Sequence, residues 1–139
     1  MKTIELFAGS KSFSKVAKKF GYETFTTDIE SEYEPDLVAD ILDLKASDFP
    51  YQPDILWASP PCTFFSVASI GKHWNKDHTP KSKEALLGIK IVLKTLELIK
   101  ELNPKYFFIE NPRGKLRKMK FMQELAGTLS VIVGMEILE

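Results

Sequence analysis

Cys62 and Glu110 are the two residues whose chemistry and position in the sequence indicate catalysis. Cys62 is the only cysteine of the chain, and it follows a hydrophobic run that ends at two prolines, within Asp54–Ser66. A lone cysteine is by default a small buried core residue. Cys62, however, directly follows a predicted strand, and the carboxyl edge of the sheet is where an α/β fold presents a nucleophile. Glu110 ends another hydrophobic run, which predicts a carboxyl group at the same edge.

The end of the first hydrophobic run supplies groups suited to a cofactor. Phe7-Ala8-Gly9-Ser10 follows that run, just as Ser59–Cys62 and 110–113 follow two later ones. In a parallel sheet these ends lie along one edge, and the first and fourth strands commonly flank the switch point where nucleotide-like cofactors bind. Asp28, just past the second run, suits a carboxylate that accepts hydrogen bonds from ribose hydroxyls. A thiol and a carboxyl group beside such a cleft favour an enzyme.

Short apolar strands that alternate with helical segments must position these groups. This alternation predicts one α/β domain over 1–139, with a mostly parallel sheet and helices on both faces. The expected strands are Thr3–Ala8, Glu23–Thr27, Leu37–Ala39, Asp54–Ala58, Tyr106–Ile109 and Leu129–Ile137. A further helix is expected between Lys115 and the last strand.

Two helices are predicted from apolar periodicity and end signals. Ser10 is expected to cap the first, which ends at Gly21. Thr79 and Pro80 are expected to start the second. The predicted core-facing residues are Phe13, Val16, Ala17 and Phe20 in the first helix, and Leu86, Ile89, Val92, Leu93, Leu96 and Ile99 in the second.

Residues 63–82 show little pattern, and such a long irregular segment inside a compact domain is usually functional. The segment follows Cys62 and carries both histidines, His73 and His78. Two histidines without a second cysteine do not make a metal site, so no metal is predicted. A loop that closes over a substrate is the better interpretation.

Composition limits the classes of function. Nineteen basic and nineteen acidic residues give a formal net charge of zero, so nucleic-acid binding would need a local basic patch. One such cluster follows Glu110, although a solvated helix face explains it equally well; it comprises Arg113, Lys115, Arg117, Lys118 and Lys120. A single cysteine excludes an intramolecular disulfide framework. Without a signal-peptide profile or a membrane-spanning run, the sequence predicts a cytoplasmic protein with no membrane partner.

Four segments together resemble the DNA (cytosine-5)-methyltransferases. They are Glu5–Gly9, the turn at Asp28, Asp54–Ser66 with its Pro-Cys pair, and Phe108–Asn111 with its Glu-Asn pair. Their order and spacing match the amino-terminal catalytic half of that family over nearly all of the chain. The segment through Cys62 looks especially like small phage-encoded members, which implies a bacterial or phage-infected cell and a restriction-modification setting.

The resemblance implies a Rossmann-like fold that uses S-adenosylmethionine to methylate carbon 5 of a cytosine flipped out of DNA. Cys62 matches the nucleophile that adds to carbon 6, and Glu110 the carboxyl group that engages N3 and the exocyclic amine. The residues implied to bind the cofactor are Phe7, Ala8, Gly9, Asp28, Ile29, Asp40 and Pro60. Those implied to bind the substrate are Pro61, Ser66, Asn111 and Arg113.

Simpler roles remain open for several of these residues. Asp28 and Asp40 could cap turns, Glu110 could cap a helix, and Phe7 could belong to the core. The chain also has Ser10-Lys11-Ser12 where the family continues into glycines.

Met122–Glu139 contains no counterpart of the family's later motifs, so the chain looks like a minimal or truncated catalytic half. Three functions therefore stay open. The first is an active enzyme, completed by a partner chain or a second copy. The second is a relative that binds cofactor or DNA without turnover. The third is an N4-cytosine amino-methyltransferase, which Ser59-Pro60-Pro61 also resembles.

Overall fold

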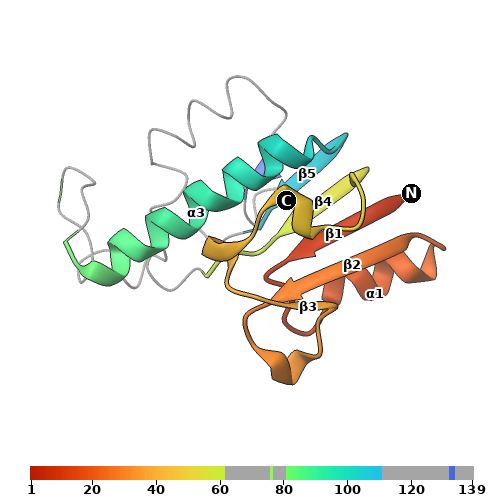
Figure 1. Ribbon diagram of the computed structural model, residues 1–139, viewed down its shortest axis with the longest axis horizontal. Coiled ribbons are helices and arrows are strands. Elements are labelled where there is room, and N and C mark those ends of the chain that lie inside the picture. The colour runs from red at the N-terminus through yellow and green to blue at the C-terminus, as the bar shows by residue number, and fades with distance from the viewer. Residues whose placement is uncertain (62–75, 77–80, 111–131, 134–139) are drawn as a thin grey trace.

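A parallel β-sheet organises the computed structural model, which describes residues 1–61, 76, 81–110 and 132–133 (Figure 1). Within these residues the sheet has six strands in the order β3-β2-β1-β4-β5-β6, and every neighbouring pair is parallel. The strands are β1 (Lys2–Leu6), β2 (Glu23–Asp28), β3 (Leu37–Val38), β4 (Ile55–Ala58), β5 (Tyr106–Ile109) and β6 (Ile132–Val133). The order reverses between β1 and β4, which is the switch point of a doubly wound fold.

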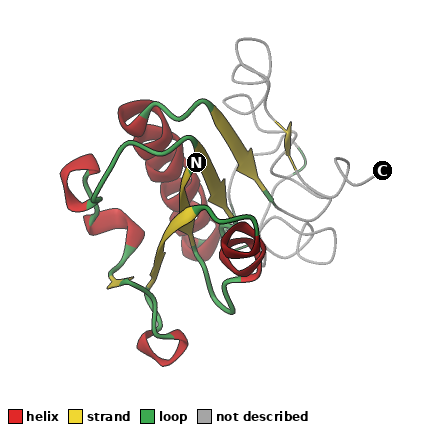
Figure 2. Cartoon of the chain, turned by 90° about the vertical axis from the view of Figure 1, so that its right-hand side faces the viewer, coloured by secondary structure: helices red, strands yellow, loops and turns green. Residues whose placement is uncertain are grey.

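Two α-helices cover opposite faces of the sheet, α1 (Ser12–Lys19) and α3 (Lys83–Leu102) (Figure 2). On β1, the buried Glu5 side chain contacts the backbone of α1, while Ile4 and Leu6 belong to the core cluster that includes the buried residues of α3. Successive side chains of a strand point to opposite faces, so this alternation places the helices on both sides. The predicted α/β, Rossmann-like class is confirmed. Three short 3-10 helices, η1 (Ser31–Tyr33), η2 (Ile41–Asp43) and η3 (Ala46–Asp48), complete the described elements.

The hydrophobic core lies between the sheet and α3. Ile4, Leu6, Leu56 and Ile109 are fully buried on three adjacent strands, and α3 packs Leu98 against them. Fully burying a side chain of this kind contributes about 1.5–3 kcal/mol. This core holds β1, β4 and β5 side by side, so the segments that follow them leave the sheet at neighbouring points.

Strand ends differ from the sequence prediction by one or two residues. β5 has the predicted bounds, and β2 runs one residue further, to Asp28. β1 begins at Lys2 and ends at Leu6 instead of Ala8, because Phe7 adopts a left-handed conformation (φ 57°) that an extended strand cannot contain. β3 ends at Val38. β6 falls within the predicted last strand, the rest of which lies outside the described residues.

The prediction for α1 was wrong at its start and on two core positions. The helix begins at Ser12 after Lys11, and Ser10 does not cap it. Val16 and Phe20 are 52% and 71% exposed, although they were expected to face the core. Ala17 is buried as predicted. A helix of eight residues buries a narrow stripe against the sheet, which leaves the other apolar side chains in solvent. The chain leaves the helix as expected, through Gly21 at φ +78°.

α3 starts later than predicted and turns a different stripe to the core. Ser82 caps it by accepting a hydrogen bond from the Ala85 N–H (3.1 Å), whereas Thr79 and Pro80 lie outside the described residues. Of the predicted stripe, Val92 and Ile99 are buried, and Ile89 and Leu96 are partly buried. Leu86 and Leu93 are 49% and 45% exposed, and the buried positions include Ala85, Gly88 and Thr95. Small residues on the sheet-facing side let the helix approach the strands closely.

Other predicted segments cannot be compared with the structure. The loop over 63–82 and the helix after Lys115 lie almost wholly outside the described residues. Among the helices that the structure does describe, none is long and apolar enough to cross a membrane.

Candidate functional site

A pocket of about 520 Å³ lies at the switch point of the sheet, where a doubly wound fold binds its ligands. Five of the seven residues predicted to bind a cofactor line it: Phe7, Gly9, Asp28, Ile29 and Asp40. The other two, Ala8 and Pro60, are buried and do not belong to the lining. Pro61, which was predicted to bind substrate, lines this pocket instead. The fold therefore gathers segments from the ends of β1, β2 and β4 around one cavity.

Asp28 joins two walls of this pocket. Its Oδ2 accepts a hydrogen bond from the Gly9 N–H (2.8 Å), and its Oδ1 accepts one from the Glu30 N–H (2.9 Å). Asp28 therefore caps a turn, as the simpler interpretation of the sequence proposed, and it also lines the pocket. An ionised carboxylate can accept about four hydrogen bonds. Asp28 therefore keeps capacity for hydroxyl donors of a ligand after both backbone bonds have formed.

The segment between β1 and α1 has unusual backbone geometry. Phe7, Gly9 and Lys11 have φ angles of 57°, 48° and 62°, in the left-handed region. Residues other than glycine in this region cost of order 1–3 kcal/mol each, and such strain gathers at functional sites. A Cβ added at Gly9 would have no atom within 4 Å, so the requirement for glycine there is conformational. The Asp28 carboxylate bonded to Gly9 stabilises this loop.

Asp40 has a similar double position. Its Oδ1 accepts a hydrogen bond from the Leu42 N–H (3.0 Å) and so caps η2, and the residue also lines the pocket. Its second oxygen has no backbone partner among the hydrogen bonds of the described chain. The capping interpretation from the sequence is therefore correct, and an acidic group still faces the cavity.

Sequence reasoning missed most of the apolar wall of this pocket. Leu42 follows Asp40, Tyr33 ends η1, and Leu87 and Ile91 come from α3. Leu87 is 44% exposed and Tyr33 is 45% exposed, so neither is core. The signal that could have found the helix residues is the pair Leu86-Leu87, because two adjacent residues of a helix cannot both lie on one narrow apolar stripe. Nothing in the sequence marks Tyr33, because a tyrosine in a polar loop is ordinary.

A second pocket of about 580 Å³ adjoins the first and contains Glu110. Phe7, Gly9 and Ser59 line both cavities and form the wall between them. The Glu110 N–H donates to the Ala58 carbonyl oxygen (2.8 Å), so the register that pairs Ala58 with Ile109 continues past the strand ends. Ser59 and Glu110 therefore lie on adjacent segments at the carboxyl edge of the sheet. The predicted carboxyl group thus stands beside the segment that leads to Cys62.

An aromatic stack supports the wall from one face of the sheet. Phe13 of α1 stacks on Trp57 of β4, with ring centroids 5.1 Å apart and planes 11° apart, and Trp57 lies 5.6 Å from Phe108 of β5. The Trp57 indole N–H donates to Ser59 Oγ (3.1 Å). Each aromatic pair contributes about 0.5–1.5 kcal/mol beyond its buried area. The stack therefore fixes the orientation of Ser59 between the two pockets.

Glu5 is a second carboxylate in the Glu110 pocket. It is 4% exposed, and its Oε2 accepts a hydrogen bond from the Ser14 N–H (3.0 Å) in the first turn of α1. The residue before that turn, Lys11, gives no side-chain cap, so Glu5 supplies the missing acceptor from the neighbouring strand. A negative charge at this end of a helix is also favoured by the helix dipole.

Four predicted site residues lie outside the described residues: Cys62, Ser66, Asn111 and Arg113. Their roles remain predictions. In the part of the chain that the structure describes, no group of three or more histidine, cysteine, aspartate or glutamate side chains could hold a metal ion.

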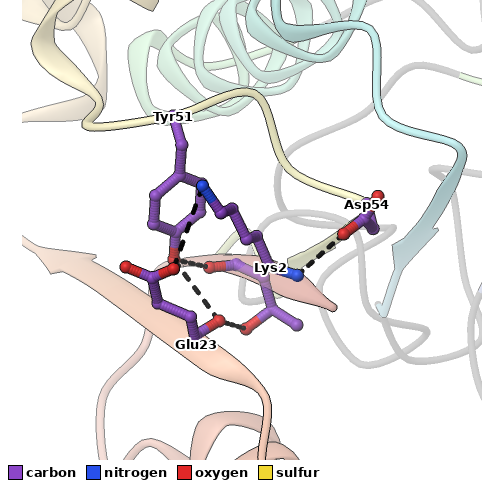
Figure 3. Close-up of polar contacts among 5 residues, drawn as sticks. Lys2, Glu23, Tyr51 and Asp54 are labelled. Carbon is purple, nitrogen blue, oxygen red and sulfur yellow. Dashed lines mark hydrogen bonds and ion pairs between the residues drawn. The ribbon is translucent and has the colours of Figure 1, made fainter.

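Among the described residues, Tyr51 and Asp54 have shifted pKa values, and both lie at the opposite, amino edge of the sheet, where Figure 3 shows their polar contacts. The Tyr51 hydroxyl donates to the Thr3 carbonyl oxygen (2.6 Å), and burial together with the nearby Glu23 charge raises the Tyr51 pKa to about 12. The Lys2 N–H donates to Asp54 Oδ2 (2.8 Å), and this hydrogen bond lowers the pKa of Asp54. Lys2 also places its Nζ 5.3 Å from the centre of the Tyr51 ring.

Comparisons with known proteins identify the family of the chain. The family model described as C-5 cytosine-specific DNA methylase matches residues 1–132. A protein of Frog virus 3 (isolate Goorha), named "Probable DNA (cytosine-5)-methyltransferase", is 33% identical over 126 residues. This match covers 85% of the present chain and 57% of the viral protein, so the chain spans little more than half the length of that relative.

Proposed function

The chain belongs to the C-5 cytosine-specific DNA methylase family, and from this premise we propose that it methylates carbon 5 of cytosine in DNA with S-adenosylmethionine as the methyl donor. Family membership supports the reaction class. The local support comes from two adjoining pockets, one lined by the cofactor residues of the family pattern and the other containing Glu110.

The residues of the first pocket fit this cofactor. A volume of about 520 Å³ lies in the range of small-molecule sites. Asp28 retains acceptor capacity for ribose hydroxyls, and Asp40 offers a carboxylate oxygen for an exocyclic amine. Ile29, Leu87 and Ile91 supply apolar surface for a ring system. When bound, the cofactor would supply a methyl group on a positively charged sulfur.

Cys62 and Glu110 divide the chemistry on the cytosine ring in this proposal. Carbon 5 is a poor nucleophile until the Cys62 thiolate adds to carbon 6 and forms a covalent bond. Glu110 holds N3 and the exocyclic amine, so the ring accepts the electron pair that the sulfur brings. Carbon 5 would then take the methyl group, and S-adenosylhomocysteine would be the leaving group. Transfer of the carbon 5 proton to solvent would restore the double bond and expel the Cys62 thiolate.

The second pocket is the proposed place for the base. The target cytosine must leave the duplex before a thiolate can reach carbon 6. Glu110 lines this pocket, and Trp57 and Phe13 give it an aromatic wall. The cofactor pocket shares Phe7, Gly9 and Ser59 with it, so a methyl group at the junction has a short path to the ring. This junction is the observation that carries the proposal.

A second candidate function is a protein that binds the cofactor or DNA without turnover. The match covers 57% of the viral relative, so similarity alone does not carry the activity of that whole protein over to this chain. The experiment below therefore measures binding and covalent chemistry separately.

Covalent capture separates these functions. DNA containing 5-fluorocytosine should trap the protein as an adduct stable on a denaturing gel when S-adenosylmethionine is present, because fluorine at carbon 5 blocks the final elimination. Cys62→Ala should abolish the adduct, and Glu110→Gln should slow its formation by about 100-fold or more. Glu97→Gln, a change of an exposed glutamate on α3, is the matched control. Calorimetric binding of S-adenosylhomocysteine without any adduct would support the non-catalytic function.

Product analysis tests the site of methylation. Ordinary DNA treated with the protein and S-adenosylmethionine should yield 5-methylcytosine after enzymatic digestion and chromatography. N4-methylcytosine has the same mass and a different retention time, and its appearance would overturn the proposal.

A further inference from the structure

η1 and the loop between β1 and α1 both contribute to the cofactor pocket, and one hydrogen bond joins them. The loop supplies Phe7 and Gly9, whereas the η1 segment supplies Tyr33. The Lys11 Nζ donates to the Glu34 carbonyl oxygen at 2.6 Å. Neither Lys11 nor Glu34 lines the pocket, so this bond acts on the arrangement of its walls rather than on a ligand.

Both ends of this bond lie in the left-handed backbone region. The φ angles are 62° at Lys11 and 49° at Glu34. Glycine adopts this region at no steric cost, whereas lysine and glutamate are strained in it. A glycine at position 11 would give an easier backbone and would lose the Nζ donor. The hydrogen bond from the Lys11 ammonium to Glu34 therefore offsets part of the backbone strain at Lys11.

The η1 segment is anchored at its two ends by other bonds. The Asp28 carboxylate accepts from the Glu30 N–H before η1. After it, the Asp36 carboxylate accepts from the Thr26 N–H (2.9 Å) and from the Thr26 hydroxyl (3.1 Å). Lys11 contacts the segment between these anchors, at the residue directly after Tyr33. Within the turn, the Tyr33 N–H donates to the Glu30 carbonyl oxygen (3.3 Å) and the Glu34 N–H donates to the Ser31 carbonyl oxygen (2.9 Å). Lys11 adds the contact that joins this turn to the loop between β1 and α1.

Tyr33 offers an exposed aromatic ring to the pocket. The residue is 45% exposed and lines the cavity together with Ile29, Asp28 and Asp40. Phe7, the other aromatic residue of this lining, belongs to the wall shared with the Glu110 pocket. Among the described lining residues, Tyr33 is thus the aromatic side chain that lies away from the wall shared with the Glu110 pocket. Planar bases stack on such rings whatever their hydrogen-bonding pattern.

We propose that Tyr33 stacks on the purine ring of the bound cofactor and that Lys11 is a positioning residue that holds η1, and hence Tyr33, against the pocket. This inference rests on the proposed function for the identity of the cofactor. It adds two residues that the family pattern of the sequence does not identify.

Calorimetric titration with S-adenosylhomocysteine tests the role of Tyr33. Tyr33→Ala should weaken binding by about tenfold, the loss of one stacking contact. Tyr33→Phe keeps the ring and should bind within a factor of about two of the unmodified protein. Tyr106→Ala is the matched control, because Tyr106 is an exposed tyrosine on β5 and does not line the pocket. Equal weakening by Tyr33→Phe and Tyr33→Ala would overturn stacking, since the hydroxyl would then be the contact.

Lys11 variants separate positioning from simple stability. Lys11→Gly relieves the backbone strain, so thermal unfolding should occur at the same or a higher temperature while S-adenosylhomocysteine binds roughly threefold more weakly. Lys11→Arg keeps a donor and should restore the affinity. In the Tyr33→Ala background, Lys11→Gly should cause no further loss, because the ring that it positions is gone. A Lys11→Gly protein that binds as tightly as the unmodified one overturns the inference.

These outcomes are distinguishable from failure of the proposed function. Unchanged affinities in the Tyr33 and Lys11 variants, together with a covalent adduct on 5-fluorocytosine DNA, would overturn the inference alone. Absence of S-adenosylhomocysteine binding by the unmodified protein, measured with the folded chain, would overturn both.

Discussion

The two edges of the sheet use polar groups in different ways. At the amino edge, polar side chains bond to the backbone of β1. The Tyr51 hydroxyl donates to the Thr3 carbonyl oxygen, 48 residues away in the sequence, and the Asp54 carboxylate accepts from the Lys2 N–H, 52 residues away. At the carboxyl edge, the carboxylates of Asp28 and Asp40 accept from loop backbone and also line a pocket. Phe7 and Lys11, whose backbone is in the left-handed region, also lie at the carboxyl edge.

The difference separates holding strands together from preparing a site. Tyr51 joins the segment before β4 to β1, and Asp54 joins the start of β4 to β1, so the amino edge fixes strand order. The carboxyl edge carries strained backbone and acceptors with capacity left over. Changes at the amino edge should therefore act on the free energy of unfolding, and changes at the carboxyl edge on ligand affinity.

Asp28→Ala should give the largest effect, because it breaks the carboxyl edge at its most connected residue. Two backbone N–H groups, those of Gly9 and Glu30, lose a charged acceptor, and the pocket loses a carboxylate. We expect S-adenosylhomocysteine affinity to fall about 100-fold, and the free energy of unfolding to fall by about 1–3 kcal/mol. Calorimetry and urea unfolding measure the two quantities. Asp43→Ala, at an exposed acid of η2 outside the pocket lining, should leave affinity unchanged; an equal loss there would remove Asp28's special role.

Tyr51→Phe is the corresponding change at the amino edge. It removes the hydroxyl that donates to Thr3 and leaves the ring in place. Loss of a partly buried hydrogen bond should lower the free energy of unfolding by about 1 kcal/mol. Affinity for S-adenosylhomocysteine should not change. A weakened affinity, measured well below the unfolding temperature, would show that the two edges are not separable in this way.

The pH dependence of the same variant sharpens the test. The folded-state pKa of Tyr51 is about 12, whereas the pKa of an unfolded tyrosine is about 10. The contribution of the protonated hydroxyl is therefore fully present below pH 10 and is lost as the pH rises toward 12. The stability difference between the unmodified protein and Tyr51→Phe should shrink over this interval. A difference that stays constant to pH 12 would contradict the assignment of the raised pKa to Tyr51.

Asp54→Asn should give the smallest effect. Asp54 accepts from the Lys2 N–H and lies 3.6 Å from the Lys105 ammonium, and both contacts are near the surface. Asparagine keeps an acceptor, so the unfolding temperature should shift by no more than about 2 °C at neutral pH. Because the folded-state pKa of Asp54 is lowered, any difference should be present above pH 4 and vanish as the pH falls below it. A large destabilisation would mean that this pair matters more than its exposure indicates.

The sequence predicted the sheet well because its signals are local. Runs such as Tyr106–Ile109 are apolar, short and bounded by breakers, and β5 has those bounds. α3 was predicted less well, since apolar side chains occur on several of its sides and only packing decides which are buried. Leu87 illustrates this point, because it is 44% exposed and lines the pocket at the switch point.

The site was predicted in part for a related reason. The resemblance selected Asp28 and Gly9 singly, and the structure adds the hydrogen bond between them. The bond from Lys11 to Glu34 joins segments that are 23 residues apart in the sequence, and their proximity depends on the whole fold. Such contacts have no periodicity and no fixed spacing, so sequence reasoning could not find them.

The wall shared by the two pockets has a thermodynamic consequence. Phe7, Gly9 and Ser59 each face both cavities, so a ligand that orders this wall from one side prepares it for a ligand on the other. Such coupling is reciprocal: the factor by which one ligand tightens the other must hold in both directions. Under the proposed function, cofactor and DNA should bind with positive cooperativity, and the order in which they arrive would change the rate of assembly without changing the final affinity.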